Sequence, residues 1–569
     1  MGEGTPVSSL GGKGMDSGGN AAHLTRNRTV PTYMHPGIYI QEIPGGRSIQ
    51  GASTSVAAFI GFAESGPYEV PTLITSWNAY TRQFGSLSWY GFMPWAVYEF
   101  FQEGGASCYI VRAKQTGSSQ GRAATANVGG TTINAASMGA WGNRLQVCIT
   151  NSSGRTSGGS SDQTPTFNLL VVVSASVITP SHAPADQATQ MLAAYVKENN
   201  LVSTTINTNS YYVLEAFSGF TTADASFQSR INTQSVFIRV AAIDNTRLPN
   251  SSTSIALSNG QNPTWDFSGA LGALATVQGV SLLAMPDTVG ATDSSGATNG
   301  LSQSELVNQG LNLCEQLGSL FYVIDPPYGQ NVSGVLSFKN GTPPAGTSHG
   351  GKAINSNYGA LYYPWAWIFN PLSKTIVPIP SSGPVLGRYA YTDSNVGVWK
   401  SPAGVNDGAL PTVASLATQV TDADQDTLNP NGINALRNLH NYGNVIYGAR
   451  TVSQDTQWTY VSVRRLFIFV EQSLKNSLQW AVFEPNDQTL WAAVSRDIGV
   501  FLTTLWNQGA FFGATAQQAF FVICDGSNNP PETRGLGQLF IDIGLAPVHP
   551  AEFVVIRITQ KTAGADSGS

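Results

Sequence analysis

Hydrophobic residues along the chain follow two patterns, one typical of buried strands and one of amphipathic helices, which together predict an α/β fold. Continuous apolar runs of strand length occur at 56–62, 108–112, 281–284 and 321–324, which is typical of strands buried on both faces of a sheet. Residues 76–84, 94–102 and 302–317 instead place apolar side chains on one helical face. Ser302 and Glu305 have capping-box spacing, and Gly318 supplies a stop for the last of these helices. Strand, helix and strand in this order predict a parallel sheet with helices packed on it.

Two stretches interrupt this pattern. From about 115 to 225 the chain is rich in Gly, Ser, Thr and Asn, with short apolar runs at 145–150 and 167–173. This texture predicts a β-rich inserted domain on the outside of the molecule. The α/β pattern is expected to resume at 236–241. Residues 328–357 combine Gly, Ser, Asn and Pro and are expected to form a loop.

The C-terminal region, from about residue 432, contains both the strand pattern and the helix pattern. Strands are expected at 444–449 and 459–463, followed by a helix over 464–481. Asn486 or Asp487 is positioned to cap a longer helix, in which Leu490, Val494 and Ile498 begin an apolar stripe. Three strands are expected to close the chain, at 519–525, 538–545 and 552–560.

Each end of the chain carries a short β-prone run with no hairpin partner beside it in sequence. The first run, 37–43, lies between two Pro/Gly pairs, and the last, 552–560, follows Pro547 and Pro550. Because a strand needs a partner for its backbone N–H and C=O groups, each run must pair with a remote segment of this chain or of another. Residues 1–30 have no periodicity and are expected to be a flexible tail.

The composition favours a protein that assembles. The chain has 569 residues, a length that predicts two to four domains. Charged residues make up 11% of it, against about 25% in an average soluble domain, and surfaces poor in charge are more easily buried against partners. The net charge is −6, with 28 basic and 34 acidic residues spread along the chain. Without a block of Lys and Arg, nucleic-acid binding is not expected.

Cysteines and apolar segments bear on where the chain folds. Four cysteines lie far apart in apolar runs and are expected to be free, buried thiols, as suits folding in a reducing cytosol; they are Cys108, Cys148, Cys314 and Cys524. No secretory signal is recognised at the N-terminus. The longest apolar stretches fall well short of the ~18 residues that suggest a membrane span, so direct membrane insertion is not expected.

Candidate chemistry is sparse. Ser348 and His349 lie side by side in a loop of glycines and prolines, whereas a subtilisin nucleophile opens a helix and its histidine comes from another segment. Asp422, Asp424 and Asp426 have the spacing of a calcium loop but lack its Gly and bidentate Glu. They are interpreted as a solvated turn. No metal or other cofactor is expected.

Two further groups of residues are given structural interpretations. Arg464 and Arg465 open a predicted helix and are expected on a solvated or salt-bridged face, with an acidic partner as the alternative. The aromatic cluster at 358–367 is expected to pack inside the protein and not to form a glycan platform. His440 and His549 are expected at turn or packing positions.

A series of motifs follows in a fixed order along the chain. The first lie at 36–42, 56–61, 66–67, 80–85 and 141–145, and the sharpest are 358–367, 380–387 and 391–404. Others follow at 428–434, 437, 448–451, 460–465 and 550–553. Together and in this order they resemble the contractile tail sheath proteins, over roughly residues 31–115 and 235–560.

The resemblance implies a multidomain α/β and α+β fold. Its parts would be a subtilisin-like α/β middle domain, a β-rich inserted outer domain, and an α+β C-terminal sheath domain with exchanged terminal strands. The expected boundaries are a tail 1–30, an N-terminal arm strand 31–50, the first part of the core 51–115, the outer domain 116–230, the middle domain 231–430 and the inner sheath domain with its C-terminal arm 431–569.

The resemblance also implies a function without catalysis. Subunits would form stacked hexameric rings around an inner tube, and contraction would drive the tube through a target envelope. Implied partners are copies of the same chain, the tube protein, and baseplate and terminator proteins. Assembly in a bacterial cytoplasm and a place in a phage tail or contractile injection particle are implied as well. Lys475 is one candidate for a tube contact.

The arms carry the implied inter-subunit contacts, because strand addition joins chains through main-chain hydrogen bonds while domains move as rigid bodies. The candidate exchange residues are Gly37, Ile38, Tyr39, Ile40, Gln41, Glu42, Ile43, Glu552, Phe553, Val554, Val555, Ile556, Arg557, Ile558 and Thr559.

Two other function classes stay open from the sequence. A surface adhesin would use the 115–225 domain to bind glycans and would form no tube. A subtilisin-like hydrolase would need a Ser, a His and an Asp converging in one cleft.

Overall fold

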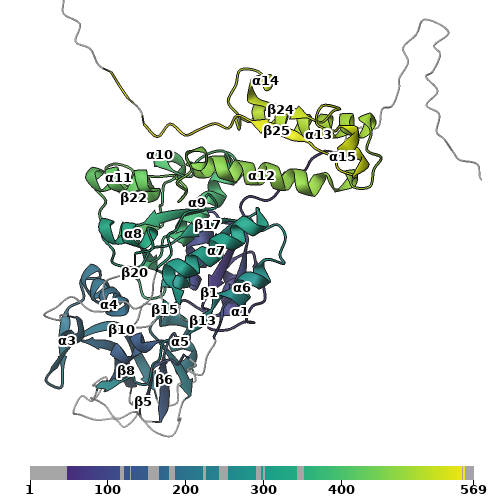
Figure 1. The fold of residues 1–569 in the computed structure, drawn as a ribbon. Helices are drawn as coiled ribbons and strands as arrows, with labels where there is room; N and C mark the ends of the chain where they lie inside the picture. The colour runs from purple at the N-terminus through teal and green to yellow at the C-terminus, as the bar shows by residue number, and fades with distance from the viewer. Residues whose placement is uncertain are drawn as a thin grey trace, which may run out of the picture. The chain divides into compact units, whose positions relative to one another are not determined.

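A computed structural model describes residues 48–115, 121–128, 130–151, 166–178, 186–221, 226–242, 254–289, 297–298, 301–342, 351–553 and 555–557. Contacts divide the chain into residues 1–46 and residues 47–569. All described residues belong to the second part, whose elements are shown in Figure 1.

The centre of the fold is an eight-stranded sheet with the order β2-β3-β1-β14-β17-β18-β22-β23. Its inner strands run parallel and its two edge strands antiparallel. The strands are β1 Ala57–Gly61, β2 Thr72–Ile74, β3 Cys108–Arg112, β14 Leu282–Ala284, β17 Phe321–Ile324, β18 Gly359–Tyr363, β22 Ile433–Leu439 and β23 Gly443–Ile446. The strands predicted at 56–62, 108–112, 281–284 and 321–324 are confirmed.

Helices cover both faces of this sheet (Figure 1). Alternate residues of β1 point to opposite sides, so Phe59 joins one buried cluster and Ile60 the other. The first face packs against α1 Trp77–Phe84, α2 Met93–Gln102 and α9 Ser382–Asn395; the second packs against α6 Phe267–Leu274, α7 Gln303–Leu317, α8 Val332–Lys339 and α11 Asp422–Leu428.

Local signals explain most helix starts. The capping box of Ser302 and Glu305 forms at α7, and Gly318 ends that helix in the left-handed region. The loop expected at 328–357 is wrong in part, because α8 lies inside it. Asn331 caps α8 by accepting the Gly334 N–H at 2.8 Å, and Val335 is fully buried. Burial of this apolar side chain outweighs the weak helix propensity of glycine.

Helices α2 and α9 pack unusually close because α9 presents glycines to α2. A Cβ at Gly383 would lie 2.5 Å from the Ala96 Cα, and one at Gly387 would lie 2.5 Å from the Glu103 Cβ. A larger residue at either position would push the two helices apart.

The inserted region forms its own sheets. A five-stranded sheet has the order β12-β7-β8-β10-β9, and a three-stranded sheet has the order β11-β6-β5. The strands are β5 Thr125–Val128, β6 Thr131–Ala135, β7 Leu145–Asn151, β8 Thr166–Ser174, β9 Ser203–Ile206, β10 Asn209–Thr221, β11 Ile238–Ala242 and β12 Ser254–Ala256, with helices α3 Ala175–Ile178, α4 Gln187–Glu198 and α5 Phe227–Gln234.

The insertion is longer than the sequence suggested. The run at 236–241 was expected to resume the α/β core, but β11 pairs with β6 of the outer sheet. An apolar run in the sequence indicates that a strand is buried, but it does not indicate to which sheet the strand belongs. The chain leaves and returns at adjacent points, because β4 Lys114–Gln115 pairs with β13 Trp265–Asp266.

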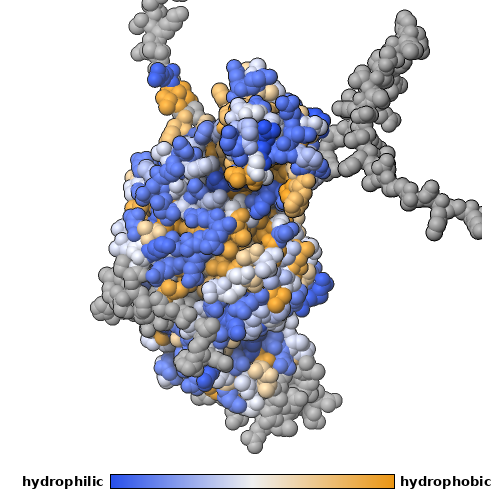
Figure 2. All heavy atoms as spheres, turned by 45° about the vertical axis from the view of Figure 1, so that its right-hand side comes forward, coloured by the Kyte–Doolittle hydropathy of each residue, from blue (hydrophilic) through white to orange (hydrophobic). Residues whose placement is uncertain are grey.

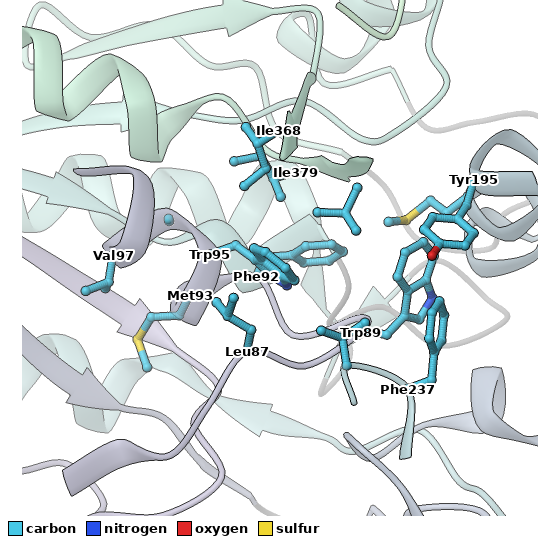
Figure 3. Packing of buried hydrophobic residues seen from close by; sticks show 14 of the residues in the cluster. Leu87, Trp89, Phe92, Met93, Trp95, Val97, Tyr195, Phe237, Ile368 and Ile379 are labelled. Atoms are coloured by element: carbon cyan, nitrogen blue, oxygen red, sulfur yellow. The ribbon is translucent and has the colours of Figure 1, made fainter. Parts of the chain in front are cut away.

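Aromatic side chains join the inserted region to the core (Figure 3). Trp89 stacks on Phe237 with ring centroids 4.8 Å apart and meets Tyr195 of α4 edge-on at 5.2 Å. Phe92 and Trp95 continue the same buried cluster into α2. The 358–367 aromatic cluster is likewise buried, in β18 and in a small sheet of β19 Ala366–Asn370, β20 Thr375–Ile379 and β21 Val413–Leu416.

A third buried cluster belongs to the C-terminal residues. Its elements are α12 Val461–Ser477, α13 Gln488–Asn507, α14 Ala516–Ala519, β24 Phe520–Ile523, α15 Pro531–Gly535 and β25 Asp542–Leu545. The strand expected at 459–463 is wrong, because α12 begins at Val461. Asp487, and not Asn486, caps α13. Since β22 and β23 extend the large sheet, the packing places the start of this unit at α12, later than residue 431.

The remaining short elements are α10 Gly404–Asp407, β15 Ala297–Thr298, β16 Leu301–Ser302 and 3-10 helices at Ala140–Arg144, Pro286–Val289, Asn429–Asn431, Thr456–Trp458 and Gln479–Ala481.

A buried ion pair connects α12 to the helices on the large sheet. Arg465 donates to the Asp393 carboxylate at 3.0 Å through Nη1, and the two side chains are 3% and 1% exposed. Arg465 also donates to the Thr54 carbonyl at 3.0 Å. The expectation of a salt-bridged face is met, but the face is buried and not solvated.

Replacing Asp393 should therefore cost much of the stability of the chain. Asp393→Ala leaves the Arg465 guanidinium buried without its anion, a change that costs about 3–5 kcal/mol. Urea unfolding would show a large fall in midpoint. Glu198→Ala is the matched control, since it removes an exposed pair with Lys197. Equal midpoints for the two variants would contradict this assignment.

Candidate functional site

Glu552 marks the root of the C-terminal arm, and several side chains hold it. Arg450 Nε donates to its two carboxylate oxygens at 2.9 and 3.2 Å, and Arg450 Nη2 also pairs with it. Asn429 donates to Oε1 at 2.7 Å, and the Tyr460 hydroxyl donates to Oε2 at 3.3 Å. We call Glu552, Arg450, Asn429 and Tyr460 the arm anchor.

The large sheet positions the anchoring arginine. Asn434 on β22 is fully buried; its side chain donates to the Arg450 carbonyl at 2.7 Å and accepts the Arg450 N–H at 2.7 Å. One amide thus satisfies both backbone groups of Arg450, as a neighbouring strand would. The Arg450 backbone is therefore held in place, and its guanidinium group is oriented toward Glu552 of the arm.

Electrostatic interactions stabilise the arm anchor at neutral pH, where Glu552 is ionised. Burial raises the pKa of Glu552, but the hydrogen bonds from Arg450 and Asn429 outweigh it and hold the pKa below its ordinary value. The Arg450 and Glu552 side chains are 19% and 18% exposed, so the pair is only partly screened by water. The contribution of this pair is present above the ordinary glutamate pKa and is lost as the pH falls through the depressed one.

Beyond Glu552 the described residues of the arm are exposed. Phe553, Val555 and Ile556 are 74%, 78% and 78% exposed. The strand expected at 552–560 does not form in the part that is described, since residues 551–553 and 555–557 pair with none of the described strands. In Figure 1 this segment runs from β25 past α12 toward α11. Val554, Ile558 and Thr559 lie outside the described residues.

The N-terminal exchange residues, 37–43, also lie outside the described residues. The chain that follows them is fixed along α12. Ile49 is buried in the third cluster, the Gln50 N–H donates to Ser477 Oγ at 3.1 Å, and the Ala52 N–H donates to Ser473 Oγ at 2.9 Å. Both arms thus depart from points that hydrogen bonds define.

A small sheet in the C-terminal unit offers an open edge. β24 pairs with β25 along one side, and among the described strands none pairs with its other side. Phe521 and Ile523 on β24 are 54% and 38% exposed. Two strands alone are marginally stable, and an open edge is a template for an added strand. Figure 2 shows that apolar side chains also gather on the face below this unit.

The other residues that the sequence suggested as candidates give less support for a functional site. Ser348 and His349 lie outside the described residues. Asp422, Asp424 and Asp426 lie on α11 and not in a turn, because Thr421 and Asp424 form a capping box. Within the described ranges, no three His, Cys, Asp or Glu side chains gather closely enough to hold a metal ion. No helix among the described residues is long and apolar enough to cross a membrane. The four cysteines are free and buried.

Comparison with known proteins shows which family the C-terminal part of the chain resembles. The profile of the phage tail sheath protein central domain matches residues 321–452, and that of the phage tail sheath C-terminal domain matches residues 453–561. The tail sheath protein of Vibrio phage KVP40 is 25% identical over 251 residues, covering 43% of this chain and 36% of that protein. The tail sheath protein of Enterobacteria phage T4 is 24% identical over 214 residues, covering 37% and 32%. Over residues 321–561 the chain is therefore similar to the contractile tail sheath family.

The fold agrees with a sheath structure. The sheath complex of PVC, an extracellular contractile injection system, in its contracted state has a TM-score of 0.52 at 21% identity, covering 93% of this chain and 99% of that chain. The matches to the KVP40 and T4 sheath proteins span only about a third of those longer proteins.

The structure shows contacts among these sheath-like segments that the sequence motifs alone did not reveal. Asn429, Asn434, Arg450, Tyr460 and Glu552 each fall in a segment that carries the family resemblance, yet only Glu552 was named as a site residue. The sequence reasoning missed that Asn429, Arg450 and Tyr460 converge on the Glu552 carboxylate and that Asn434 supports the Arg450 backbone. The available signal was Asn434, a polar residue in the otherwise apolar run 433–436. The exposed Lys475 lies on α12.

Proposed function

We propose that this chain is the structural subunit of a contractile sheath. Copies of it would form stacked hexameric rings around an inner tube, and the sheath would shorten to drive that tube through a target envelope. Its partners would be other copies of itself, the tube protein, and baseplate and terminator proteins. It would assemble in a bacterial cytoplasm and act in a phage tail or a contractile injection particle.

One observation carries the proposal. The arm is clamped to its own chain at Glu552 and then continues as exposed, apolar residues with no strand partner in the described part of the chain. Exposed Phe and Ile side chains cost free energy in an isolated monomer. A neighbouring subunit whose β24 edge is open supplies both a ladder and apolar contacts for such a segment. The residues 37–43 and 552–559 would be the exchanged strands.

The domain division supports the same function. We propose a subtilisin-like middle domain around the eight-stranded sheet, an outer domain inserted after β4, and an inner domain from α12 onward that carries the arms. Pairing of β4 with β13 makes the outer domain an insertion that can vary without disturbing the core. No catalytic role is proposed, because the family is a structural one.

Electron microscopy of co-expressed proteins tests the proposal. The chain would be produced together with tube and baseplate proteins from the same source, and the particles examined in negative stain. Long, striated, sheathed tubes, some short and wide, are the expected result. Discrete small particles beside folded tube protein would instead favour the glycan-binding alternative, and a glycan array would then be the next experiment.

A further inference from the structure

A buried pair of carboxyl groups lies where α2, α9 and the segment after α10 meet. Glu99 lies on α2 and Glu103, one turn later, is the residue that caps its C-terminus; each residue is 2% exposed. Thr412 Oγ1 lies 2.5 Å from Glu99 Oε2 and 2.5 Å from Glu103 Oε1. The Thr412 N–H also donates to Glu103 Oε1, at 3.0 Å. One hydroxyl therefore bridges two carboxyl groups that water does not reach.

Counting hydrogens fixes the charge of this cluster. A hydroxyl has one hydrogen, so Thr412 can donate to only one of the two carboxyl groups. If both were ionised, the second contact would bring two oxygen lone pairs together at hydrogen-bond distance. One carboxyl group must therefore be protonated and donate to Thr412 Oγ1. This gives a chain in which a carboxylic acid donates to the hydroxyl and the hydroxyl donates to a carboxylate.

The surroundings decide which group is the acid. Arg388 Nη1 of α9 lies 3.8 Å from Glu103 Oε2, and the Thr412 N–H adds a second donor, so Glu103 is the anion. Burial raises the pKa of Glu99 to about 8, and Glu99 is the acid. Burial also raises the pKa of Glu103, but the Thr412 hydrogen bonds and Arg388 oppose the rise.

Other charged and titratable groups face the cluster from each packed element. Tyr98 precedes Glu99 on α2. Arg388 reaches across from α9 and donates to the Asp407 carbonyl at 3.3 Å. The Asp407 carboxylate pairs in turn with Lys400 at 3.4 Å. Arg388 is thus the cation nearest to the carboxyl pair, and its ion pair is with Glu103.

We propose that the proton held between Glu99 and Glu103 through Thr412 locks the segment 408–412 against α2 and α9, and that its loss at alkaline pH releases this segment. At Gly387, where a Cβ would lie 2.5 Å from the Glu103 Cβ, α9 approaches so closely that no space for water remains between the helices. Two carboxylates in one dry site repel each other. The lock is independent of the arms and of any assembly.

The direction of the pH effect follows from the raised pKa of Glu99. Its value in the unfolded chain is about 4.5 and in the folded chain about 8. Stability from this group is complete below the lower value and is lost as the pH rises through the higher one. Across that window the unfolding equilibrium constant of the native chain should rise about tenfold per pH unit, relative to a variant that cannot ionise at this position.

Glu99→Gln is that variant, because its amide can donate to Thr412 at every pH. Urea unfolding of the full chain from about pH 5 to about pH 9 should show a steeper decline for the native protein than for Glu99→Gln. Comparison at each pH cancels the contributions of Asp287, Asp325 and Glu215, buried carboxyl groups that are present in both proteins. Parallel profiles would overturn the proposal.

Infrared spectroscopy gives a second readout that does not depend on the stability of a Glu99 variant. Beside the bands of Asp325 and Glu215, which titrate at about pH 7, the native chain should show a protonated carboxylic acid band that disappears at about pH 8, the pKa of Glu99. Thr412→Ser keeps the bridging hydroxyl and should keep the band and its titration. Thr412→Val removes the bridge and should shift both. A band that is unaffected by Thr412→Val, or absent from the native chain, would also overturn the proposal.

Discussion

Removal of residues 1–44 should leave a folded chain that no longer polymerises. These residues include the N-terminal exchange run and lie outside the unit formed by residues 47–569. The chain after them remains fixed, because Ile49 is buried and Gln50 and Ala52 hydrogen-bond to α12. The core should therefore unfold at the same temperature as in the complete chain. Tubes should be lost altogether, since each subunit would lack one of its strands.

Thermal unfolding and negative-stain microscopy measure these two effects on the same preparation. Truncation of residues 1–30 alone is the matched control, because it removes the polar tail and keeps the run at 37–43. That shorter truncation should still form tubes. Normal tubes from the chain lacking 1–44 would show that the N-terminal run does not join subunits.

Reversal of charge at the arm anchor should have the second largest effect. Glu552→Lys places an ammonium group beside Arg450 in a site that is less than a fifth exposed, so Arg450 loses its anion and faces a second cation. The cost to the monomer is on the order of 2 kcal/mol, a buried-pair penalty reduced by partial exposure. The larger loss is in assembly, because an arm freed from its root must be ordered anew each time it binds.

A charge swap distinguishes the anchor from a general charge effect. Arg450→Glu combined with Glu552→Arg restores opposite charges and should recover part of the assembly. Asp422→Lys changes the charge equally in the pair with Arg437, but Asp422 is 91% exposed, so tubes should form normally. Hydrogen exchange over residues 546–553 should rise in Glu552→Lys only. Unchanged exchange and normal tubes in that variant would refute the anchor.

Sequence patterns predicted the elements that local signals define. The buried strands β1, β3 and β17 were visible as apolar runs, and α7 was visible from its capping box. The helix α8 was not, because Gly334 and the surrounding Ser and Asn residues give the composition of a loop, and only tertiary burial of Val335 reveals it. The strand β11 was recognised but assigned to the wrong sheet, since strand pairing is a long-range property.

The functional residues were predicted only in part for the same reason. Glu552 was named because it begins an unpaired terminal run. Arg450 and Asn429, which hold it, are about a hundred residues earlier in the chain and have no sequence spacing that links them to it. The Asn434 amide that supports Arg450 is equally invisible to pattern reasoning. A β-prone run without a local partner can be recognised in the sequence, whereas the residues that anchor it are identified only once the fold is known.

Cross-linking between two differently labelled chains tests most directly whether the arm serves a neighbour. One chain would carry Val555→Cys and the other Phe521→Cys on β24, each with Cys524→Ser to remove the nearest native thiol. Positions 553 and 557 would be tried in turn, because alternate residues share one face of a strand. The account predicts covalent dimers only in mixed, assembled tubes. A cross-link inside one chain carrying both substitutions, before assembly, would contradict it.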